Sequence, residues 1–349
     1  LVGSEMCIRD SPQLVVLNED LAASLDLDIE WLRSDDGLRW LTGAHGGHAT
    51  AYAGHQFGQF VPLLGDGRAL LLGDLPSPDG RVEIQLKGSG PTPFSKPGSD
   101  GRGALGPMLR EYLVSEFMHA AGVPTTRSLA VLTTGETVLR QHGPVPGGVV
   151  VRVATSHLRV GSVQYAATQS ADLVDSVVAA AGFNTPEELL RTVMERQLDL
   201  IAQWLRLGFV HGVMNTDNTA LSGQTIDYGP CAFTERFRVD ACFSSIDVQK
   251  RYAFGHQPDI IAWNLSHLAE ALLPVSDIDA MQDILAGMES TWHHLWAEHV
   301  PDPEALARAD DITTFNREHH EGPLFVPRNQ MLEEAITAAR SPFCSAAVI

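Results

Sequence analysis

The sequence predicts an α+β protein with a strand-rich first half and a mainly helical second half. Strand-type runs lie at 69–73, 82–87, 131–140 and 148–153, and helical periodicity lies at 108–121, 186–207, 258–273, 276–299 and 329–340. Where the helical half has begun, His211 and Asn218 have the spacing of a protein kinase's catalytic loop, and Asp227-Tyr228-Gly229 follows as Asp-Phe-Gly does in kinases. Together these observations predict a protein-kinase-like two-lobed fold, with a strand-rich N-lobe, a mainly helical C-lobe and a cleft between them.

The connecting segments support this order of elements. Residues 13–42 have apolar residues at helical spacing, interrupted at Asp35-Asp36-Gly37. Turn-forming residues at 76–80 are expected to join the first two strands as a hairpin. A Gly/Pro/Ser-rich loop at 88–106 then leads into the first long helix, which Gly122 is expected to end.

Three parts of the chain are expected on this interpretation. Residues 1–11 have no apolar segment of the signal-peptide kind and are expected to be a non-native scar. Residues 12–147 hold an N-terminal lead-in and the N-lobe, and residues 148–349 hold the helical C-lobe with the catalytic and metal-binding loops. The chain stops directly after a helical stretch, so we expect it to be truncated at its C-terminus.

Composition excludes several classes of function. The formal net charge is −19, from 43 acidic and 24 basic residues, whereas nucleic-acid-binding surfaces are normally basic, so nucleic acid is not an expected partner. No run of about 18 apolar residues occurs, so neither a transmembrane helix nor a membrane partner is expected. The four cysteines include no Cys-x-x-Cys pair, which favours a reducing, cytoplasmic location over a zinc site or a disulfide scaffold.

Parts of a nucleotide site occur in the order that kinases have. Gly65-Asp66-Gly67-Arg68 is a candidate glycine-rich hairpin, whose backbone amides can approach phosphates because glycine has no side chain. Lys87 ends a strand, as the phosphate-binding lysine of kinases does, and Glu111 on the next helix is its candidate partner. Each residue alone has an ordinary alternative as a turn or surface residue, and their shared order favours a site.

Asn218 and Asp227 are the candidate ligands of a divalent metal ion, because Mg²⁺ and Mn²⁺ prefer oxygen donors and bridge phosphates. Val213 occupies the position of the kinase catalytic aspartate, so the usual base for phosphorylating a hydroxyl is missing. Ordinary kinase chemistry is therefore not the expected reaction.

Additional cations lie near this set in the sequence. Arg152 and Arg159 stand where an ordinary kinase has no such pair, and guanidinium groups suit bidentate contact with phosphate. A surface ion pair is the alternative for both arginines. Asp100 and Gly101 lie in the loop after Lys87, within reach of the same cleft.

Several blocks of the sequence resemble the selenoprotein O (SelO) family, over roughly residues 13–272. The blocks are Tyr52-Ala53-Gly54-His55-Gln56-Phe57-Gly58, Leu64-Gly65-Asp66-Gly67-Arg68, Leu86-Lys87-Gly88-Ser89-Gly90, 211–218, Ile226-Asp227-Tyr228-Gly229-Pro230, Arg251-Tyr252-Ala253-Phe254 and 257–265. They are long enough to be highly specific.

Members of the SelO family are pseudokinases that bind ATP in a flipped orientation and transfer AMP to Ser, Thr or Tyr hydroxyls of proteins. The resemblance implies a protein adenylyltransferase that uses ATP with Mg²⁺ or Mn²⁺, releases pyrophosphate and has proteins as partners. With the nucleotide reversed, the α-phosphorus faces the incoming hydroxyl, so the base can move from the position of Val213 to Asp217. The implied roles are Asp217 as proton acceptor, Lys87 and Glu111 as the catalytic pair, Asn218 and Asp227 as metal ligands, and Gly65, Gly67, Arg68, Lys87, Asp100, Gly101, Arg152 and Arg159 as nucleotide contacts.

The chain departs from the family pattern in three places. Part of the N-terminal lead-in is missing, and the region 286–327 is short. The C-terminal redox motif of the family is not visible, since Cys344 has no cysteine partner at that spacing.

Three alternatives stay open at this stage. The chain could be a catalytically inactive nucleotide-binding pseudokinase scaffold, or a small-molecule phosphotransferase of the aminoglycoside-kinase type, although the latter enzymes carry His-Gly-Asp where this chain has Val213. His45, His48 and His55 could bind zinc, but no accompanying carboxylate motif supports this, and ordinary loop contacts are the simpler interpretation.

Overall fold

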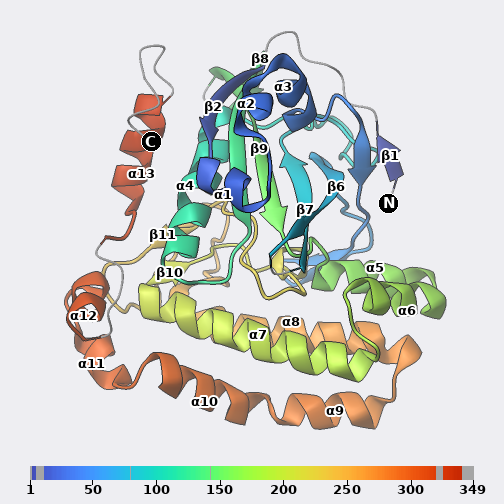
Figure 1. The fold of residues 1–349 in the computed structure, drawn as a ribbon. Helices are drawn as coiled ribbons and strands as arrows, with labels where there is room; N and C mark the ends of the chain where they lie inside the picture. Colours follow the sequence, from blue (N-terminus) through green and yellow to red (C-terminus); the bar gives the residue numbers. More distant parts are fainter. Residues whose placement is uncertain (1, 5–11, 79, 142, 320–324, 340–349) are drawn as a thin grey trace.

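The structure is a computed structural model that describes residues 2–4, 12–78, 80–141, 143–319 and 325–339. The fold is α+β, with one large antiparallel sheet and long helices below it (Figure 1). The strands of this sheet lie in the order β1 (Val2–Ser4), β3 (Gly47–Ala49), β6 (Ala69–Ser77), β7 (Gly80–Lys87), β9 (Gly143–Ala154), β8 (Arg127–Arg140) and β2 (Gln13–Leu17). The four strands predicted from apolar runs are confirmed as β6, β7, β8 and β9.

Alternation along β7 decides which side chains face the site. Ile84 and Leu86 point into a core that the sheet shares with α1 (Glu19–Ser24), α2 (Ile29–Arg33) and α3 (Asp35–Leu41). Because side chains alternate across a strand, Gln85 and Lys87 lie on the opposite face. The polar side chains of β7 therefore gather on the face of the sheet that α1–α3 leave uncovered.

Two predicted helical stretches need correction. Within 13–42, residues 13–17 form the edge strand β2, which pairs with β8, because this short continuous apolar run completes the sheet. The interruption after α2 falls at Ser34, whose side chain caps α3, so Asp35 begins a helix instead of breaking one. The stretch 276–299 is two helices, α9 (Ile278–Ala286) and α10 (Met288–His299), which are divided at Gly287.

The second half of the described chain is mainly helical. Its largest core cluster is built around α7 (Pro186–Leu207), which α8 (Gln257–Leu272), α9 and α10 pack against. Thr185 and Pro186 begin α7, and Gly208, with φ +74°, ends it. The remaining helices are α5 (Val160–Gln169), α6 (Ala171–Ala180), α11 (Pro303–Arg308), α12 (Ile312–His319) and α13 (Asn329–Ala339).

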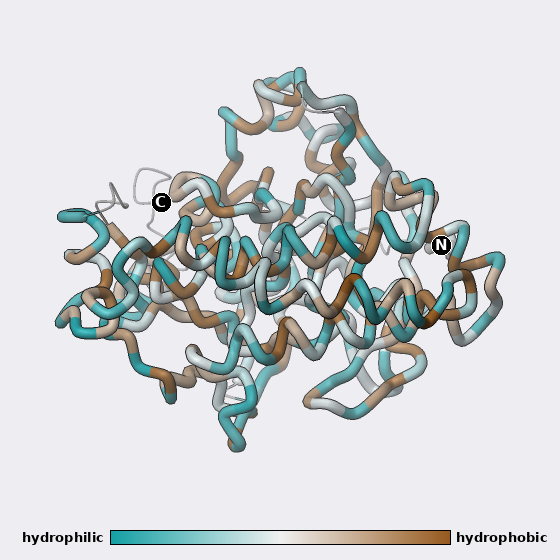
Figure 2. Tube along the Cα trace, turned by 90° about the horizontal axis from the view of Figure 1, so that it is seen from below, coloured by the Kyte–Doolittle hydropathy of each residue, from teal (hydrophilic) through white to brown (hydrophobic). Residues whose placement is uncertain are grey.

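Helix α4 (Leu105–Ala120) joins the sheet to the rest of the molecule. It packs on β8 and β9, and α13 lies beside it (Figure 1). Seen from below, the helices carry hydrophilic and hydrophobic residues in alternating bands, as expected for helices with one buried face (Figure 2). None of the helices in the described part of the chain has the length and apolar character that a bilayer crossing requires.

Short elements lie between the sheet and the helices. The hairpin of β4 (Gly54–Gln56) and β5 (Gln59–Val61) leaves the sheet after β3 and returns to it at β6. The kinase-like motifs lie between two paired strands, β10 (Phe209–Val210) and β11 (Ala232–Phe233). The single-turn helix η1 (Thr216–Asn218) lies within this segment.

Candidate active site

Lys87 and Glu111 form a buried ion pair under the sheet. Lys87 ends β7, and its Nζ lies 2.6 Å from Oε2 of Glu111 on α4. Arg152 on β9 lies opposite Gln85 in the strand register, and it contacts the other oxygen of Glu111. The predicted Lys87–Glu111 contact is therefore present, with an arginine as a second partner of the glutamate.

Asp227 joins the same network from the far side. Its carboxylate contacts Lys87 and Arg152, and Oδ2 lies 3.9 Å from Nη1 of Arg159. Burial alone would raise the pKa of Asp227, but the charges of Lys87, Arg152 and Arg159 outweigh it and hold that pKa well below its ordinary value. Asp227 is consequently an ionised oxygen donor in a buried, strongly cationic site.

The pKa values of Glu111 and Lys87 are both lowered in this environment, for different reasons. Burial would raise the pKa of Glu111, yet Arg152 and Lys87 lower it. Burial, followed by the charge of Arg152, lowers the pKa of Lys87 in spite of its two carboxylate partners. The site therefore favours anions next to its cations and disfavours further positive charge.

Arg159 links the sheet to the η1 segment. It precedes α5, and its Nη1 donates to the backbone oxygen of Asp217 at 2.9 Å. Its Nη2 lies 3.5 Å from Oδ1 of Asp66, and its guanidinium lies over the Tyr52 ring, 4.6 Å from the centroid. Burial raises the pKa of Asp66, and Arg159 opposes this effect.

The loop Gly65–Arg68 is held in a shape that suits glycine. Gly65 has φ +59°, and a Cβ there would lie 2.4 Å from the Phe94 ring. The Thr92 hydroxyl donates to the backbone oxygen of Asp66 at 2.6 Å, which fixes the loop against the 92–95 turn. This loop, the ends of β6 and β7, and the cations surround a cavity of about 60 Å³, lined by Tyr52, Asp66, Gly67, Arg68, Ala69, Lys87, Arg152, Arg159 and Asp227.

Two side chains of the kinase-like loop bind backbone oxygens and hold the loop in place. His211 Nε2 lies 2.8 Å from the backbone oxygen of Ile226, which ties the start of the loop to the residue before Asp227. The amide of Asn218 donates to the backbone oxygen of Val213 at 3.0 Å. Asp227 has φ +67°, a left-handed conformation that aspartate tolerates better than most residues.

Asp217 lies beneath the β4–β5 hairpin. A Cβ at Gly54 would come within 2.5 Å of its Oδ1, so the hairpin backbone touches the carboxylate directly. Gln56 bonds to the same carboxylate, while Oδ1 is buried without a hydrogen-bond partner among the described residues. Burial raises the pKa of Asp217 to about 6, although Arg159 lowers it. A buried carboxylate with a free oxygen and a raised pKa is suited to accept a proton.

Asp100 and Gly101 lie apart from the cavity. Asp100 pairs with Arg140 at 2.9 Å in a partly exposed position, and Gly101, with φ +61°, packs against Gly90 and Pro91. Neither lines the cavity, whereas Gly67, Arg68, Lys87, Arg152, Arg159 and Asp227 do.

Sequence reasoning missed the residues that connect this set. Tyr52, Gly54 and Gln56 belong to one of the signature blocks, and nothing in the local sequence assigns them a role. Their contacts with Arg159 and Asp217 join segments more than 100 residues apart, which no local pattern encodes. The one available signal was the presence of a glycine-containing block just before the Gly65–Arg68 loop.

No group of three or more His, Cys, Asp or Glu side chains that could hold a metal ion occurs in the described part of the chain. His48 lies in β3, and His55 stacks on His267 with ring centroids 4.0 Å apart. The oxygen donors Asn218 and Asp227 fit a divalent ion only if further ligands, such as phosphate oxygens, complete the coordination.

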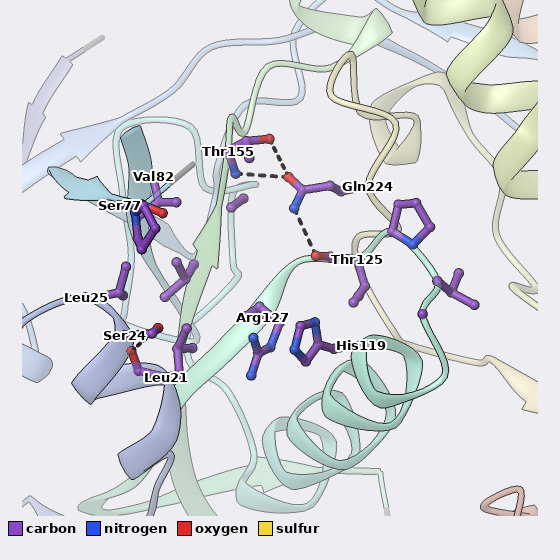
Figure 3. Close-up of a pocket in the computed structure, with 16 residues that line it drawn as sticks. Leu21, Ser24, Leu25, Ser77, Val82, His119, Thr125, Arg127, Thr155 and Gln224 are labelled. Atoms are coloured by element: carbon purple, nitrogen blue, oxygen red, sulfur yellow. Dashed lines mark hydrogen bonds between the residues drawn. The ribbon is translucent and has the colours of Figure 1, made fainter. Parts of the chain in front are cut away.

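A second, larger cavity of about 510 Å³ lies between α1, the turn after β6 and the segment that follows α4 (Figure 3). It contains none of the predicted site residues. Its cation Arg127 is engaged by Glu116 at 2.6 Å.

Gln224, which lines this cavity, holds the segment before Asp227 in place. Gln224 accepts from the backbone N–H of Thr155 at 3.0 Å and donates to the backbone oxygen of Thr125 at 3.0 Å (Figure 3). The ends of β9 and β8 are thereby joined to the chain three residues before Asp227.

The chain is similar in sequence to known proteins over most of its length. The family described as "Protein adenylyltransferase SelO" matches residues 6–302. Similar proteins include three named "Protein nucleotidyltransferase YdiU": that of Corynebacterium efficiens is 44% identical, covering 95% of this chain and 83% of the relative. That of Rhodococcus jostii is 50% identical (88% of this chain), and that of Geobacillus kaustophilus is 53% identical (86% of this chain). The chain spans only 66% of the length of the latter two relatives.

Proposed function

Because the chain belongs to the SelO family of protein adenylyltransferases, we propose that it transfers AMP from ATP to hydroxyl groups of proteins and releases pyrophosphate. The acceptors are Ser, Thr or Tyr side chains. The observation that carries the proposal is Asp217, a buried carboxylate with one free oxygen on the segment that Arg159 binds, in a chain where Val213 replaces the kinase base.

The proposed arrangement is that of a two-lobed kinase-like enzyme. The sheet-containing lobe starts at residue 12 and extends beyond the expected boundary at residue 147 to Ala154, because β9 runs through that boundary in the middle of the sheet. The chain after β9 forms the mainly helical lobe, with ATP bound between the two. The cavity beneath β6 and β7 supports this placement, because it is lined both by the sheet and by Arg159 and Asp227 of the second part.

The cations bind the phosphates. Arg68, Lys87, Arg152 and Arg159 all line one cavity, so four positive charges surround the proposed position of the phosphates. The glycines Gly65 and Gly67 let backbone amides approach. Asp100 and Gly101 lie apart from the cavity and would contact only a part of the nucleotide that extends beyond it. A cavity of about 60 Å³ is too small for a triphosphate, so binding exchanges the contacts of the cations with carboxylates for contacts with phosphate oxygens.

Asn218 and Asp227 are the residues that would hold Mg²⁺ or Mn²⁺, with phosphate oxygens of the nucleotide completing the coordination. When bound, such an ion neutralises phosphate charge and orients the leaving group. Lys87, Arg152 and Arg159 keep Asp227 ionised, and a metal ion would share this carboxylate only when phosphate groups offset the charge of those three side chains.

In the proposed reaction, the acceptor oxygen attacks the α-phosphorus of ATP. A new oxygen–phosphorus bond forms, the bond between the α-phosphorus and the bridging oxygen breaks, and pyrophosphate leaves. The hydroxyl proton moves to the free Oδ1 of Asp217. Lys87, Arg152 and Arg159 stabilise the charge that accumulates on the departing group.

An inactive scaffold is the second candidate. The joint presence of Lys87, Glu111, Asn218 and Asp227, with the first two and Asp227 in contact, favours an enzyme, because a scaffold needs no metal ligands.

The test uses ATP labelled at either the α- or the γ-phosphate, with Mg²⁺ or Mn²⁺, followed by intact mass. We expect label from the α position only and a mass gain of one AMP per modified site. Asp227→Asn, which keeps the left-handed backbone of this position and removes the charge, should abolish transfer. Asp74→Asn, which removes an exposed charge on β6 paired with Arg81, should not. Label from the γ position would identify a kinase, and nucleotide binding without any transfer would support the scaffold.

A further inference from the structure

Three side chains form a closed hydrogen-bond network next to Asp217. Gln164 lies on α5, Thr216 begins η1 and His55 is the middle residue of β4, and the first two are buried. The Thr216 hydroxyl donates to Oε1 of Gln164 at 2.8 Å and accepts from the backbone N–H of His55 at 2.7 Å. Nε2 of Gln164 and Nδ1 of His55 lie 2.8 Å apart and close the network. One side chain, that of Gln164, therefore joins three elements that are far apart in the sequence.

The chemistry of this network requires an amide at position 164. The backbone N–H of His55 can only donate, so the Thr216 oxygen accepts from it and directs its own proton to Oε1 of Gln164. The amide nitrogen of Gln164 then donates to Nδ1 of His55. Burial, followed by the neighbouring His267, lowers the pKa of His55, which keeps its ring neutral and able to accept. Glutamine supplies the acceptor and the donor together, which neither a carboxylate nor an apolar side chain does.

The residues that the network joins are those that surround the Asp217 carboxylate. Thr216 directly precedes Asp217 in the chain. On either side of His55, Gln56 bonds to the carboxylate of Asp217, and a Cβ at Gly54 would lie 2.5 Å from its Oδ1. A shift of β4 relative to η1 would therefore change the position and the surroundings of this carboxylate.

Helix α5 is a firm support for Gln164. Gly161 lies one turn earlier on the same face of the helix, and its backbone oxygen accepts from the N–H of Ala53 at 2.9 Å. A Cβ at Gly161 would lie 2.1 Å from the Ala53 oxygen and 3.4 Å from Cα of Asp217. The start of α5 thus packs directly against both the hairpin and the η1 segment, and Gln164 holds the two together from a fixed position.

We propose that Gln164 is a positioning residue of the transfer reaction: its amide fixes β4 relative to η1 and so keeps the Asp217 carboxylate where it accepts the hydroxyl proton. The inference rests on the proposed function and extends it to a residue outside the phosphate site, because Gln164 does not line the cavity that Lys87 and Arg152 line. Its contribution is therefore expected in the rate of transfer and not in the affinity for the nucleotide.

Gln164→Met tests this role, because methionine has a similar length and helix propensity but can neither accept from Thr216 nor donate to His55. The acceptor is a synthetic peptide with one Ser, one Thr and one Tyr. We expect kcat for transfer from α-labelled ATP to fall by about 10- to 100-fold, as for a small displacement of a catalytic group. The affinity for α,β-methylene-ATP should stay at the wild-type value. The matched control is Gln169→Met, the same change at an exposed position of α5, which should leave kcat unchanged.

Two variants of Thr216 test the same network from its other side. Thr216→Ser keeps the hydroxyl and should keep most of kcat, whereas Thr216→Val keeps the shape and loses both hydrogen bonds, so that kcat should fall as in Gln164→Met. The double variant Gln164→Met/Thr216→Val should lose little more than either single variant, because both changes break the same bond.

A merely structural role of Gln164 predicts different results. All rates are measured at a temperature well below the thermal midpoint of each variant. Wild-type kcat in Gln164→Met or in Thr216→Val, or losses that multiply in the double variant, would overturn the positioning role while the proposed function stands. A loss of nucleotide affinity as large as the loss of kcat would do the same, because it would show a general loosening of the site. If the wild type transfers no AMP from α-labelled ATP to the peptide or to itself, the proposed function fails, and the role of Gln164 fails with it.

Discussion

Replacement of Gly54 by alanine tests the contact between the hairpin and Asp217. The backbone at Gly54 is not left-handed, so alanine introduces no backbone strain there. Its Cβ, however, would lie 2.5 Å from Oδ1 of Asp217, 2.9 Å from Cδ1 of Leu64 and 3.0 Å from Cβ of Asp217. The leucine can turn away, whereas the aspartate is struck at two atoms and has to move with its backbone.

The size of the effect follows from these distances. Ordinary contact begins at 3.4 Å, so the carboxylate has to retreat by 3.4 − 2.5 = 0.9 Å. A displacement of this order in a catalytic group lowers the rate by on the order of 100-fold. The crowding itself should lower the free energy of unfolding by about 1–3 kcal/mol.

The assay measures kcat for transfer of the α-labelled AMP group, with thermal denaturation and α,β-methylene-ATP binding in parallel. We expect a large loss of kcat in Gly54→Ala with nearly unchanged nucleotide affinity, because Gly54 does not line the cavity formed by Arg68, Lys87 and their neighbours. Gly287→Ala is the control, since its Cβ would meet nothing closer than 3.4 Å and its φ is negative. Wild-type kcat in Gly54→Ala would refute the assignment of Asp217, held against this hairpin, as proton acceptor.

Three further predictions concern the cations, the pH and the metal. Arg152→Lys keeps the charge but cannot contact Glu111 and Asp227 together, so we expect weaker α,β-methylene-ATP binding and a loss of roughly 2 kcal/mol in unfolding free energy, checked by calorimetry and denaturation; unchanged binding would contradict the phosphate role. Burial lowers the pKa of His157 from the ordinary 6.5, in spite of its Nδ1 contact with Glu83 at 2.9 Å. As the pH falls, the unfolded chain therefore binds a proton at His157 before the folded protein does, and stability that is present above pH 6.5 is lost below it. The free energy of unfolding should decline less between pH 7.5 and 5.5 in His157→Gln than in the wild type. An equal decline in both would show that His157 does not contribute. Excess EDTA should reduce AMP transfer by on the order of 100-fold, with recovery on addition of Mg²⁺ or Mn²⁺, and full activity in EDTA would exclude the metal.

Local sequence was sufficient to predict the strands and the Lys87–Glu111 pair. Strand β7 combines an apolar face at Ile84 and Leu86 with a polar face that ends in Lys87, and Glu111 follows on the next long helix. These features depend on side-chain alternation and short connections, which a sequence displays directly. The division of 276–299 at Gly287 was missed because the periodicity continues across the break.

The covering of Asp217 could not be predicted in the same way. Strands β4 and β5 have three residues each, too short for a periodic signal. The residue that holds this hairpin over Asp217, Thr216, lies more than 150 residues after His55, whose N–H it binds. Asp100 illustrates the reverse case. Its place in the loop after Lys87 predicts that it reaches the cleft, but its carboxylate pairs with Arg140 at 2.9 Å, and it does not line the cavity. Ion-pair choice among several exposed partners is a tertiary property.

The left-handed backbone of Asp227 restricts how this position can change during evolution. Only glycine, asparagine and aspartate adopt φ near +67° at little cost, so most replacements would damage the fold before they altered the chemistry. Asparagine is the exception, because it keeps the backbone shape and removes the charge that is proposed to hold the metal. A related protein with asparagine at this position would fold but be inactive, and this single position would distinguish inactive family members from active ones.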